Sequence, residues 1–325
     1  MSISVVIPNY NGIDLLKVNI PAIYNALNLS KLPYEIIVAD DASTDASISF
    51  LEKTYSDIKI IRNEVNQGFA PTANKGIFAC NNKLVFMVNS DVLLTSDYFS
   101  PQLKYFEDSD TFGVMGRIIG LDNDKIQDAG KIQNKNGLKI GSDHNKFPTT
   151  QTNDWFPSLY LSGANALMNR EKLLALGGFD EIYKPFYGED LDLSLRAWKV
   201  GWKCYYEHNS ICRHPNSVTI NKYNNKKKIR IVIYKNRFLM HFIHLSGLKK
   251  LGWNLWLVGQ LIVKILTWRK EFLLGFQEFL KLIPAAKKSK ENLFLLSKKT
   301  RIAKSNKEVY KFIDDAINKI PHDTV

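Results

Sequence analysis

Short apolar runs alternate with helix-like segments through the first 90 residues, and this alternation constrains the fold more than any other feature. The runs are rich in Ile and Val and lie at 3–7, 35–40, 58–62 and 84–89. Segments with helical spacing separate them at 14–27, 44–54 and 71–80. Strands that alternate with helices predict a mostly parallel, doubly wound sheet, and such sheets bind ligands beyond the carboxyl ends of their strands.

Three of these predicted strands lead into polar clusters, which read PNYNG (8–12), DDASTD (40–45) and NSD (89–91). Asp91 is placed to hold a divalent cation bound to phosphates, because hard cations prefer carboxylate oxygens. Asp40 can accept hydrogen bonds from a ribose or a base, and Pro8, Asn9 and Tyr10 can supply backbone contacts and a ring that covers the base. Asp and Asn are also ordinary turn residues after a strand, so a purely structural role stays open for each.

Two common nucleotide-binding motifs are missing from the first half of the chain. No GxGxxG follows the first predicted strand, and no GxxxxGK[ST] is present. A dinucleotide-binding fold and a P-loop are therefore both disfavoured. The segment NQGFAPTANKG (66–76) suits a ligand-binding loop and a turn with a helix cap equally well.

The second half of the chain predicts further strands. Residues 112–150 are rich in Gly, Asn and Asp with alternating apolar positions, which indicates a β-hairpin with a loop. Residues 158–170 predict a strand interrupted by Ser162, Gly163 and Ala164, where small side chains let a ligand approach closely. Two short strands are expected after residue 202, followed by His214, which can bind a metal or serve a structural role.

The stretch GEDLDLSLRAW (188–198) predicts a helix that begins on two acids. The side chains of Leu191, Leu195, Trp198 and Trp202 fall on one helical face that can be buried. Glu189 and Asp190 then lie in the first turn, where acids are favoured by the helix dipole and where a catalytic base would also stand. Asp192 and Arg196 form an i, i+4 pair with a structural role.

Composition and charge limit the class of protein. The chain has 325 residues, 45% of them hydrophobic, which suits one large folded domain with an appendage, or two domains. The three cysteines show no CxxC spacing, the first ten residues lack the regions of a signal peptide, and no run of 18 apolar residues occurs. We therefore expect a cytoplasmic protein without a transmembrane helix.

The basic residues are concentrated in the last third of the chain. Residues 1–217 contain 21 basic and 25 acidic side chains, a net charge of −4, whereas residues 218–325 contain 23 and 7, a net of +16. Helices are expected at 225–244 and 300–318 and within 251–283, with Trp, Leu and Phe interleaved with Lys and Arg. This pattern fits a helical subdomain with solvated lysines and also a set of interfacial helices on an anionic membrane. A basic nucleic-acid-binding protein is a third interpretation, although no motif for one is present.

Six segments in this order resemble the family 2 glycosyltransferases, in particular the bacterial, rhamnosyltransferase-like enzymes that add sugars to cell-surface polysaccharides. The segments are SVVIPNYNG, EIIVADDASTD, NQGFAPTANKG, VFMVNSDVLL, SGANALMNRE and GGFDEIYKPFYGEDLDLSLRAWKVGW, and the resemblance covers about residues 3–240. It implies the GT-A fold, a Rossmann-like nucleotide-binding half joined to an acceptor-binding half. The implied division is a catalytic domain at 1–224, with halves at 1–91 and 92–224, and a basic helical region at 225–325.

The resemblance also implies a role for each candidate residue. The nucleotide sugar would contact Pro8, Asn9, Tyr10, Asp40, Asn66, Gly68, Asn89 and Ser90. Asp91 and His214 would bind Mg²⁺ or Mn²⁺, Asp190 would be the general base, and the acceptor would contact Gly163, Ala164 and Glu189. Asn89 stands where the family's DxD motif begins with Asp, which weakens the expected contact with the metal or ribose.

The implied activity is inverting, metal-dependent transfer of a hexose-type sugar. The donor would be a nucleotide-diphosphate sugar, and the acceptor a hydroxyl of a glycan or lipid-linked glycan in cell-surface polysaccharide synthesis. The protein would be cytoplasmic, with peripheral contact to the inner face of an anionic membrane and no nucleic-acid partner. A catalytically degenerate, sugar-binding or scaffold member of the same fold is the main alternative.

Overall fold

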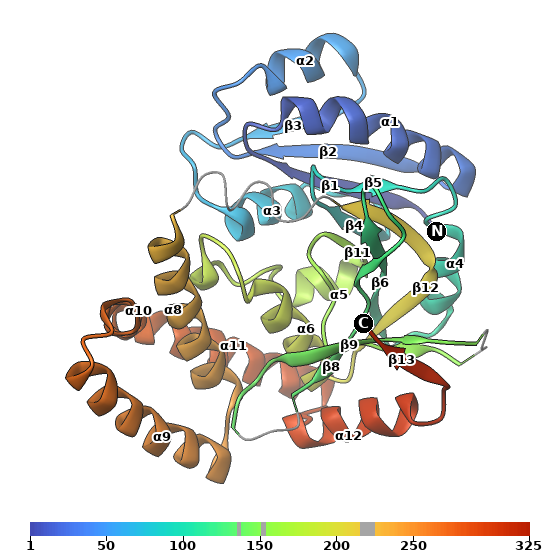
Figure 1. The fold of residues 1–325 in the computed structure, drawn as a ribbon. Coiled ribbons are helices and arrows are strands. Elements are labelled where there is room, and N and C mark those ends of the chain that lie inside the picture. Colours follow the sequence, from blue (N-terminus) through green and yellow to red (C-terminus); the bar gives the residue numbers. More distant parts are fainter. Residues whose placement is uncertain (135–137, 151–153, 215–224) are drawn as a thin grey trace.

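The computed structural model describes residues 1–134, 138–150, 154–214 and 225–325 and centres on one large mixed sheet (Figure 1). Its strand order is β10-β12-β6-β11-β4-β1-β2-β3, with β5 added to β12 and β7 added to β6. The GT-A fold expected from the sequence is the one observed, with a helical region following it in the chain.

The first half of the sheet is parallel, as the alternation of strands and helices predicted. Its strands are β1 (Ile3–Asn9), β2 (Tyr34–Asp40), β3 (Lys59–Arg62) and β4 (Leu84–Val88). The helices between them are α1 (Ile13–Ser30), α2 (Ser47–Thr54) and α3 (Phe69–Phe78). β1 pairs in parallel with both β2 and β4. Residues 3–7 of β1 are almost fully buried because helices cover both faces of a parallel sheet, which explains their continuous apolar run.

The second half mixes both strand directions. Its strands are β5 (Leu93–Leu94), β6 (Thr111–Gly120), β10 (Phe156–Pro157), β11 (Asn165–Asn169) and β12 (Lys203–His214). β11 runs antiparallel to β4 and β6, whereas β12 is parallel to β6. Two predictions were wrong here. The two short strands expected after residue 202 are one long strand with a bulge between Glu207 and Ile211, and the strand expected at 158–170 covers only residues 165–169.

A small second sheet contains the predicted hairpin. Its strands are β8 (Gly130–Gln133), β9 (Ser142–Pro148) and β13 (His322–Thr324), and β7 (Ile126–Asp128) precedes it. β8 and β9 are antiparallel, and part of the loop between them, 135–137, lies outside the described residues. β13 was not predicted; it pairs with β9, so the last residues of the sequence lie beside the second half of the catalytic core.

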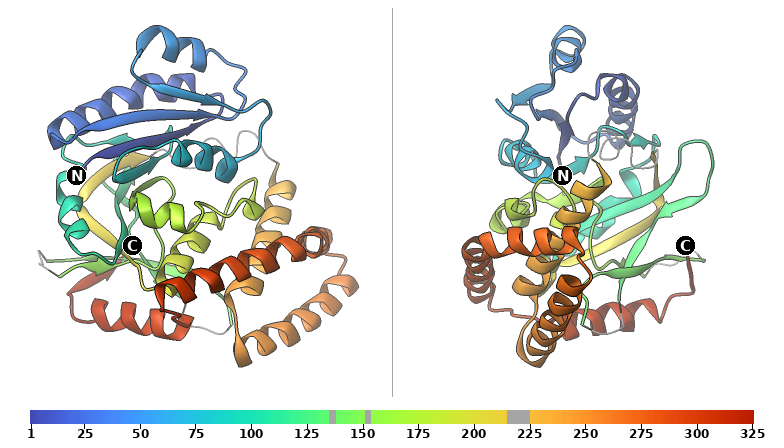
Figure 2. Two further views of the ribbon diagram at one scale, coloured as in Figure 1. Left: turned by 180° about the vertical axis from the view of Figure 1, so that it is seen from behind. Right: turned by 60° about the vertical axis from the view of Figure 1, so that its left-hand side comes forward.

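Five helices make up the region after residue 225, which packs against the core (Figures 1 and 2). They are α8 (Lys226–His244), α9 (Gly247–Leu266), α10 (Lys270–Lys281), α11 (Ile283–Thr300) and α12 (Asn306–Ile317). Phe238 and Ile243 of α8 share a hydrophobic cluster with Leu195 and Trp198 of the catalytic half. Within the described residues, no helix combines the length and apolar character needed to cross a bilayer. The expected boundary at 224/225 falls where residues 215–224 lie outside the described chain, so the division stays a prediction.

Helix α6 (Glu189–Lys199) is buried far more completely than a helix with one apolar face. The shorter helical segments that precede α6 in the chain are α4 (Ser100–Leu103), η1 (Lys104–Glu107), α5 (Arg170–Ala175) and η2 (Glu181–Tyr183).

Within α6, the burial includes charged side chains as well as apolar ones. Leu195 and Trp198 are fully buried, as predicted, but so is Asp192, and Arg196 is nearly so. Trp202 lies beyond the last helical residue and is only partly buried. The predicted Asp192–Arg196 pair is therefore present as a pair inside the protein.

Asp192 connects α6 to α8 through charged hydrogen bonds. Its carboxylate accepts from Arg196 Nε at 2.7 Å and from Tyr183 Oη at 3.2 Å. His244 Nε2 lies 2.8 Å from the same carboxylate and must be the donor, because an ionised carboxylate only accepts. Burial alone would raise the pKa of Asp192, but the Arg196 charge and the His244 hydrogen bond outweigh it and lower this pKa to about 2.

Asp192→Asn should lower the free energy of unfolding by about 3 kcal/mol, because it leaves the Arg196 charge buried without its counter-ion. Denaturant unfolding followed by circular dichroism measures this change. Asp14→Asn is the matched control, since the Asp14 carboxylate is 93% exposed and 3.8 Å from Lys17 Nζ. We expect the control to change stability by less than about 0.5 kcal/mol. Equal shifts for the two variants would contradict a stabilising role for the buried pair.

Candidate active site

The ends of β1 and β2 form the first part of the candidate site. Asn9 and Asp40 are register partners, and Asn9 Nδ2 donates to Asp40 Oδ1 at 3.0 Å. Asp40 is fully buried, and its two carboxylate oxygens accept from the backbone N–H and hydroxyl of Ser43. Asp40 therefore shapes this turn. Because Asp40 is fully buried, the turn would have to open before Asp40 could accept the predicted hydrogen bond from a ribose or base.

The neighbouring Asp41, which the sequence interpretation missed, organises the loop that contains Asn66 and Gly68. Its Oδ1 accepts from Asn63 Nδ2 and from the backbone N–H of Gln67, each at 2.8 Å, and its Oδ2 accepts from the N–H of Gly68 at 2.9 Å. Asn66 is exposed in this loop. The two adjacent acids were visible in the sequence, but nothing indicated that Asp41 would be the one to bind this loop.

Gly68 brings this loop against the segment that leads into α6. Its φ is +91°, and a Cβ at this position would lie 2.7 Å from the carbonyl oxygen of Pro185. The N–H of Phe69 donates to that same oxygen at 3.0 Å. Glycine is required at residue 68 both by the backbone conformation and by the close approach.

The end of β4 brings the two predicted metal ligands together. Asp91 Oδ1 lies 3.2 Å from His214 Nε2, and each side chain is largely buried. This proximity follows from the pairing of β5 with β12, in which Leu93 is the register partner of Arg213. Asp91 Oδ1 has no hydrogen-bond partner among the described residues.

A carboxylate and an imidazole that meet in this way suit a divalent cation whose remaining ligands are phosphate oxygens. Across the described parts of the chain, no group of three or more His, Cys, Asp or Glu side chains is placed to hold a metal ion. The two residues therefore fit an ion that a donor phosphate helps to bind.

The turn around Gly163 and Ala164 lies between the NSD segment and the acid pair. The Ala164 carbonyl accepts from the N–H of Asn89 at 3.1 Å. A Cβ placed on Gly163 would lie 4.0 Å from Asp190 Cβ and 3.3 Å from the Phe69 ring. One short turn thus hydrogen-bonds the predicted metal segment and lies beside the predicted base.

The acid pair is held at the start of α6 by a side chain from α8. Asn236 Nδ2 lies 2.8 Å from the carbonyl oxygen of Tyr183, 2.9 Å from that of Phe186 and 2.7 Å from that of Tyr187. Gly188 follows with a φ of +97° and begins the helix. The sequence interpretation assigned no role to Asn236, which lies 46 residues beyond Asp190 and has no local signal.

Burial sets the electrostatics of the two acids. It raises the pKa of Asp190, an effect that Asp128 strengthens and that the N–H of Leu191 and the Lys131 charge partly offset. Burial and the neighbouring Asp190 charge also raise the pKa of Glu189. Glu189 Oε2 is buried and has no partner among the described residues. A carboxylate with a raised pKa is suited to accept a proton near neutral pH.

Three further residues near Asp190 carried no recognisable sequence signal. Lys131 Nζ forms an ion pair with Asp128 and lies 5.4 Å from the centre of the Tyr160 ring. Burial raises the pKa of Tyr160, and Asp190 and Asp128 raise it further. Asp128 and Lys131 belong to the segment that the sequence predicted only as a hairpin, and Tyr160 lies just before the break at Ser162–Ala164.

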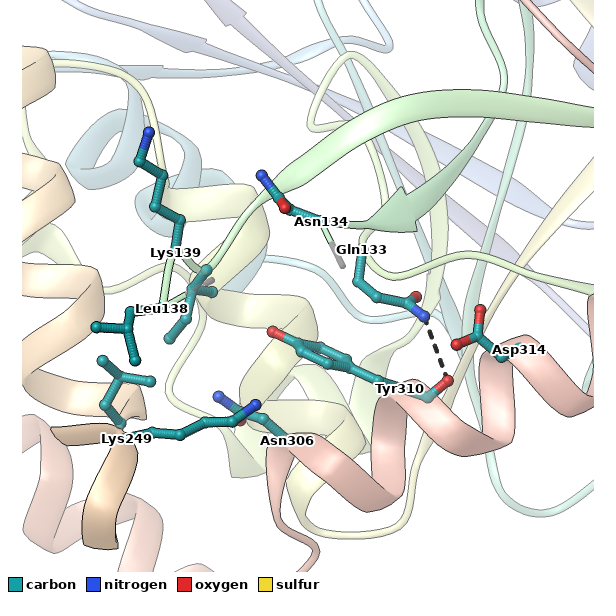
Figure 3. Close-up of a pocket in the computed structure, with 10 residues that line it drawn as sticks. Gln133, Asn134, Leu138, Lys139, Lys249, Asn306, Tyr310 and Asp314 are labelled. Atoms are coloured by element: carbon teal, nitrogen blue, oxygen red, sulfur yellow. Dashed lines mark hydrogen bonds between the residues drawn. The ribbon is translucent and has the colours of Figure 1, made fainter. Parts of the chain in front are cut away.

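Two hollows lie outside this site. One, of about 180 Å³, lies between the β8–β9 hairpin and α12, where the Tyr310 ring projects into it (Figure 3). The other, of about 330 Å³, is bordered by Asn74, Phe179 and Arg196 and by Asn292 and Leu296 of α11. Neither contains a residue of the candidate site.

The sequence profile described as "Glycosyl transferase family 2" matches residues 4–177, more than half of the chain. The chain belongs to this family. The match spans β1 to the end of α5 and so includes Asp91 and the Gly163 turn, while Asp190 and His214 lie beyond it.

Related proteins extend the comparison. The poly(ribitol-phosphate) beta-glucosyltransferase of Bacillus spizizenii is 31% identical over 126 residues, 37% of this chain and 20% of that protein. The uncharacterized glycosyltransferase YfnE of Bacillus subtilis is 24% identical over 292 residues, 71% of this chain and 73% of its own length. The chain thus spans only a fifth of the first relative.

Solved structures share the fold at low sequence identity. GalNAc-T7 with UDP, GalNAc and Mn²⁺ gives a TM-score of 0.64 at 15% identity, covering 98% of this chain and 57% of that one. Residues 1–349 of Staphylococcus aureus TarS in complex with UDP-GlcNAc give 0.57 at 14% identity, covering 98% and 92%.

Asn236→Ala should reduce turnover about tenfold or more while leaving affinity for the donor nearly unchanged, because the loop before Glu189 loses its support and small displacements of reacting groups are costly. Steady-state kinetics and calorimetric titration with the donor separate these effects. Asn254→Ala, at an exposed position on α9, is the control and should leave both unchanged. A parallel loss of donor affinity would contradict a role restricted to positioning the acid pair.

Proposed function

We propose that this protein transfers a sugar from a nucleotide-diphosphate sugar to a hydroxyl of a glycan or lipid-linked glycan in cell-surface polysaccharide synthesis, with inversion at the anomeric carbon. The observation that carries the proposal is the 3.2 Å approach of Asp91 and His214 in a family 2 chain. The turn at Gly163 and Ala164 links this pair to Asp190. The relative named for poly(ribitol-phosphate) supports a polysaccharide acceptor.

Asp91 and His214 are proposed to hold Mg²⁺ or Mn²⁺, which would neutralise the charge of the departing diphosphate. The presence of Mn²⁺ with UDP in a structure of the same fold supports this use of the pair. Asn89 contributes an amide where the family's DxD motif has a carboxylate, so the negative charge around the ion is lower by one. Binding of the metal ion should therefore depend more strongly on His214.

Asp190 is proposed to accept the proton of the acceptor hydroxyl as its oxygen attacks the anomeric carbon. The bond between that carbon and the diphosphate oxygen breaks in the same step, and the electron pair leaves with the diphosphate. Glu189, whose pKa is raised by burial, can keep its proton near neutral pH and donate a hydrogen bond that positions the acceptor. Inversion follows because attack and departure occur on opposite faces of the sugar.

The donor is proposed to lie along the loops after β1, β2 and β4. Pro8, Asn9 and Tyr10 would contact the nucleotide, together with Asn66, Gly68, Asn89 and Ser90 from neighbouring loops. The hydrogen bonds that Asn9 donates and Asp41 accepts already fix two of these loops, so the donor would meet a largely preformed surface. The UDP-GlcNAc complex of a protein with the same fold supports a nucleotide-sugar donor.

Asp190→Asn should reduce transfer by about 10²-fold or more, because an amide cannot take the hydroxyl proton. Donor binding measured by calorimetry should persist, and Asp315→Asn, an exposed acid on α12, should behave like the native protein. In the native protein, turnover should fall as pH drops through the raised pKa of Asp190, above the value near 4 of an exposed aspartate. Retained turnover in Asp190→Asn would remove the base assignment, and a native protein that neither transfers nor hydrolyses any nucleotide sugar would favour the non-catalytic alternative.

Asp91→Ala and His214→Ala should each weaken Mn²⁺-dependent donor binding about tenfold or more, because each removes one of two protein ligands. The measurement is a calorimetric titration of the donor at fixed Mn²⁺ and again with a chelator. Asp97→Ala changes a nearby exposed carboxylate and should have no effect. An unaltered metal titration in both variants would exclude the pair as the ion site.

A further inference from the structure

Helix α9 exposes a continuous apolar surface, defined here as the α9 stripe: Leu248, Leu251, Leu255, Val258, Ile262 and Ile265. Each of these side chains is more than half exposed. Their spacing alternates between three and four residues, so they lie along one side of the helix. Leaving a stripe of this length in water is unfavourable, and apolar surface of this kind marks a contact with a partner or a membrane.

The opposite side of α9 fixes the direction in which the stripe faces. The Trp253 ring stacks on the imidazole of His241 in α8, with ring centres 3.7 Å apart, and on Trp256 at 4.6 Å. Leu257 and Leu261 also pack against the core. The stripe is therefore held outward, and α9 forms an edge of the molecule away from the main sheet (Figures 1 and 2).

The charged residues of α9 and of the turn that follows it, up to Lys270, are all basic, and Glu271 comes next in α10. α9 contains Lys249, Lys250 and Lys264 and no Asp or Glu. It is followed by Trp268, which is 78% exposed, and by the exposed residues Arg269 and Lys270. An apolar face with basic residues and an exposed Trp at its end matches an interfacial helix, whose cations attract anionic headgroups.

The alternative is that the α9 stripe contacts a second copy of the chain, since the spacing of its residues also suits a coiled coil. Paired helices of that kind select their partner with opposite charges beside the apolar seam. The flanking positions of α9 are Gly252, Asn254, Gly259, Leu261 and Leu266, none of them charged. Without opposite charges beside its apolar positions, α9 lacks this signal for pairing with a second copy, and its basic residues favour an anionic lipid surface instead.

We propose that the α9 stripe inserts into the headgroup region of an anionic bilayer, with Trp268, Arg269 and Lys270 at its edge, and holds the protein on the membrane without crossing it. This surface is separate from Asp91, Asp190 and His214, so the proposal does not depend on glycosyl transfer. It assigns to α9 the membrane contact that the sequence predicted only for the whole basic region.

The test is co-sedimentation of the full chain with vesicles of phosphatidylcholine alone and of phosphatidylcholine mixed with phosphatidylglycerol. The native chain should bind the anionic vesicles, and less at high salt. The double variant Leu255→Glu/Ile262→Glu should bind about tenfold more weakly or worse, because two charges would enter the apolar region. Val18→Glu, at a 60% exposed position on α1, is the matched control and should bind like the native chain.

A second variant, Arg269→Gln/Lys270→Gln, keeps the apolar stripe and should reduce the preference for anionic over neutral vesicles. Thermal unfolding by circular dichroism verifies that each variant is folded, and light scattering gives its mass in solution. Native binding in both double variants would overturn the proposal. A native dimer that becomes monomeric in Leu255→Glu/Ile262→Glu, without vesicle binding by the native chain, would assign the stripe to a second copy instead.

Discussion

The buried carboxylate of Asp192 is the interaction on which the arrangement of this protein most depends. It joins Arg196 of its own helix to His244 of α8, and Arg196 also donates to the carbonyl oxygens of Leu176 and Gly178. The ion pair of Asp192 and Arg196 thus connects α6 both to the first helix of the C-terminal region, through Asp192, and to the turn after α5, through Arg196. Because α6 begins with the acid pair, the same ion pair sets where Glu189 and Asp190 stand relative to the sheet.

The helical region after residue 225 consequently supports the candidate site as well as covering the core. α8 supplies His244 to Asp192 in the first turn of α6 and Asn236 to the loop before the helix starts. Both contacts are buried hydrogen bonds, so they fix the orientation of α8 relative to α6 as well as the distance between the two helices. α9 then uses α8 as its support through the stack of Trp253 on His241. The order of contacts runs from the sheet to α6, from α6 to α8, and from α8 to the exposed edge.

The sequence predicted the first half of the fold well because the information there is local. β1 to β4 are short apolar runs with helices between them, and in a parallel sheet both faces of such runs are buried. The second half was predicted less accurately, since β11 is antiparallel and β12 contains a bulge, and neither feature has a short-range pattern. β13 could not be found from the sequence because three polar residues become a strand only through pairing with β9. For the site, the motifs identified Asp91, His214, Gly163 and Asp190, and the structure brings these residues near one another. Asp41, Lys131 and Asn236 act through contacts between distant segments, which spacing along the chain does not reveal.

The contact between Gly68 and Pro185 has a consequence for how such proteins can be recombined. The loop that contains Gly68 and the segment that leads into α6 meet backbone to backbone, with no space for a side chain between them. Exchanging one half of the molecule for that of a relative therefore succeeds only when both surfaces of this seam are inherited as a matched pair. A change in the backbone of one loop must be accommodated by the other, so changes to the two segments are physically coupled.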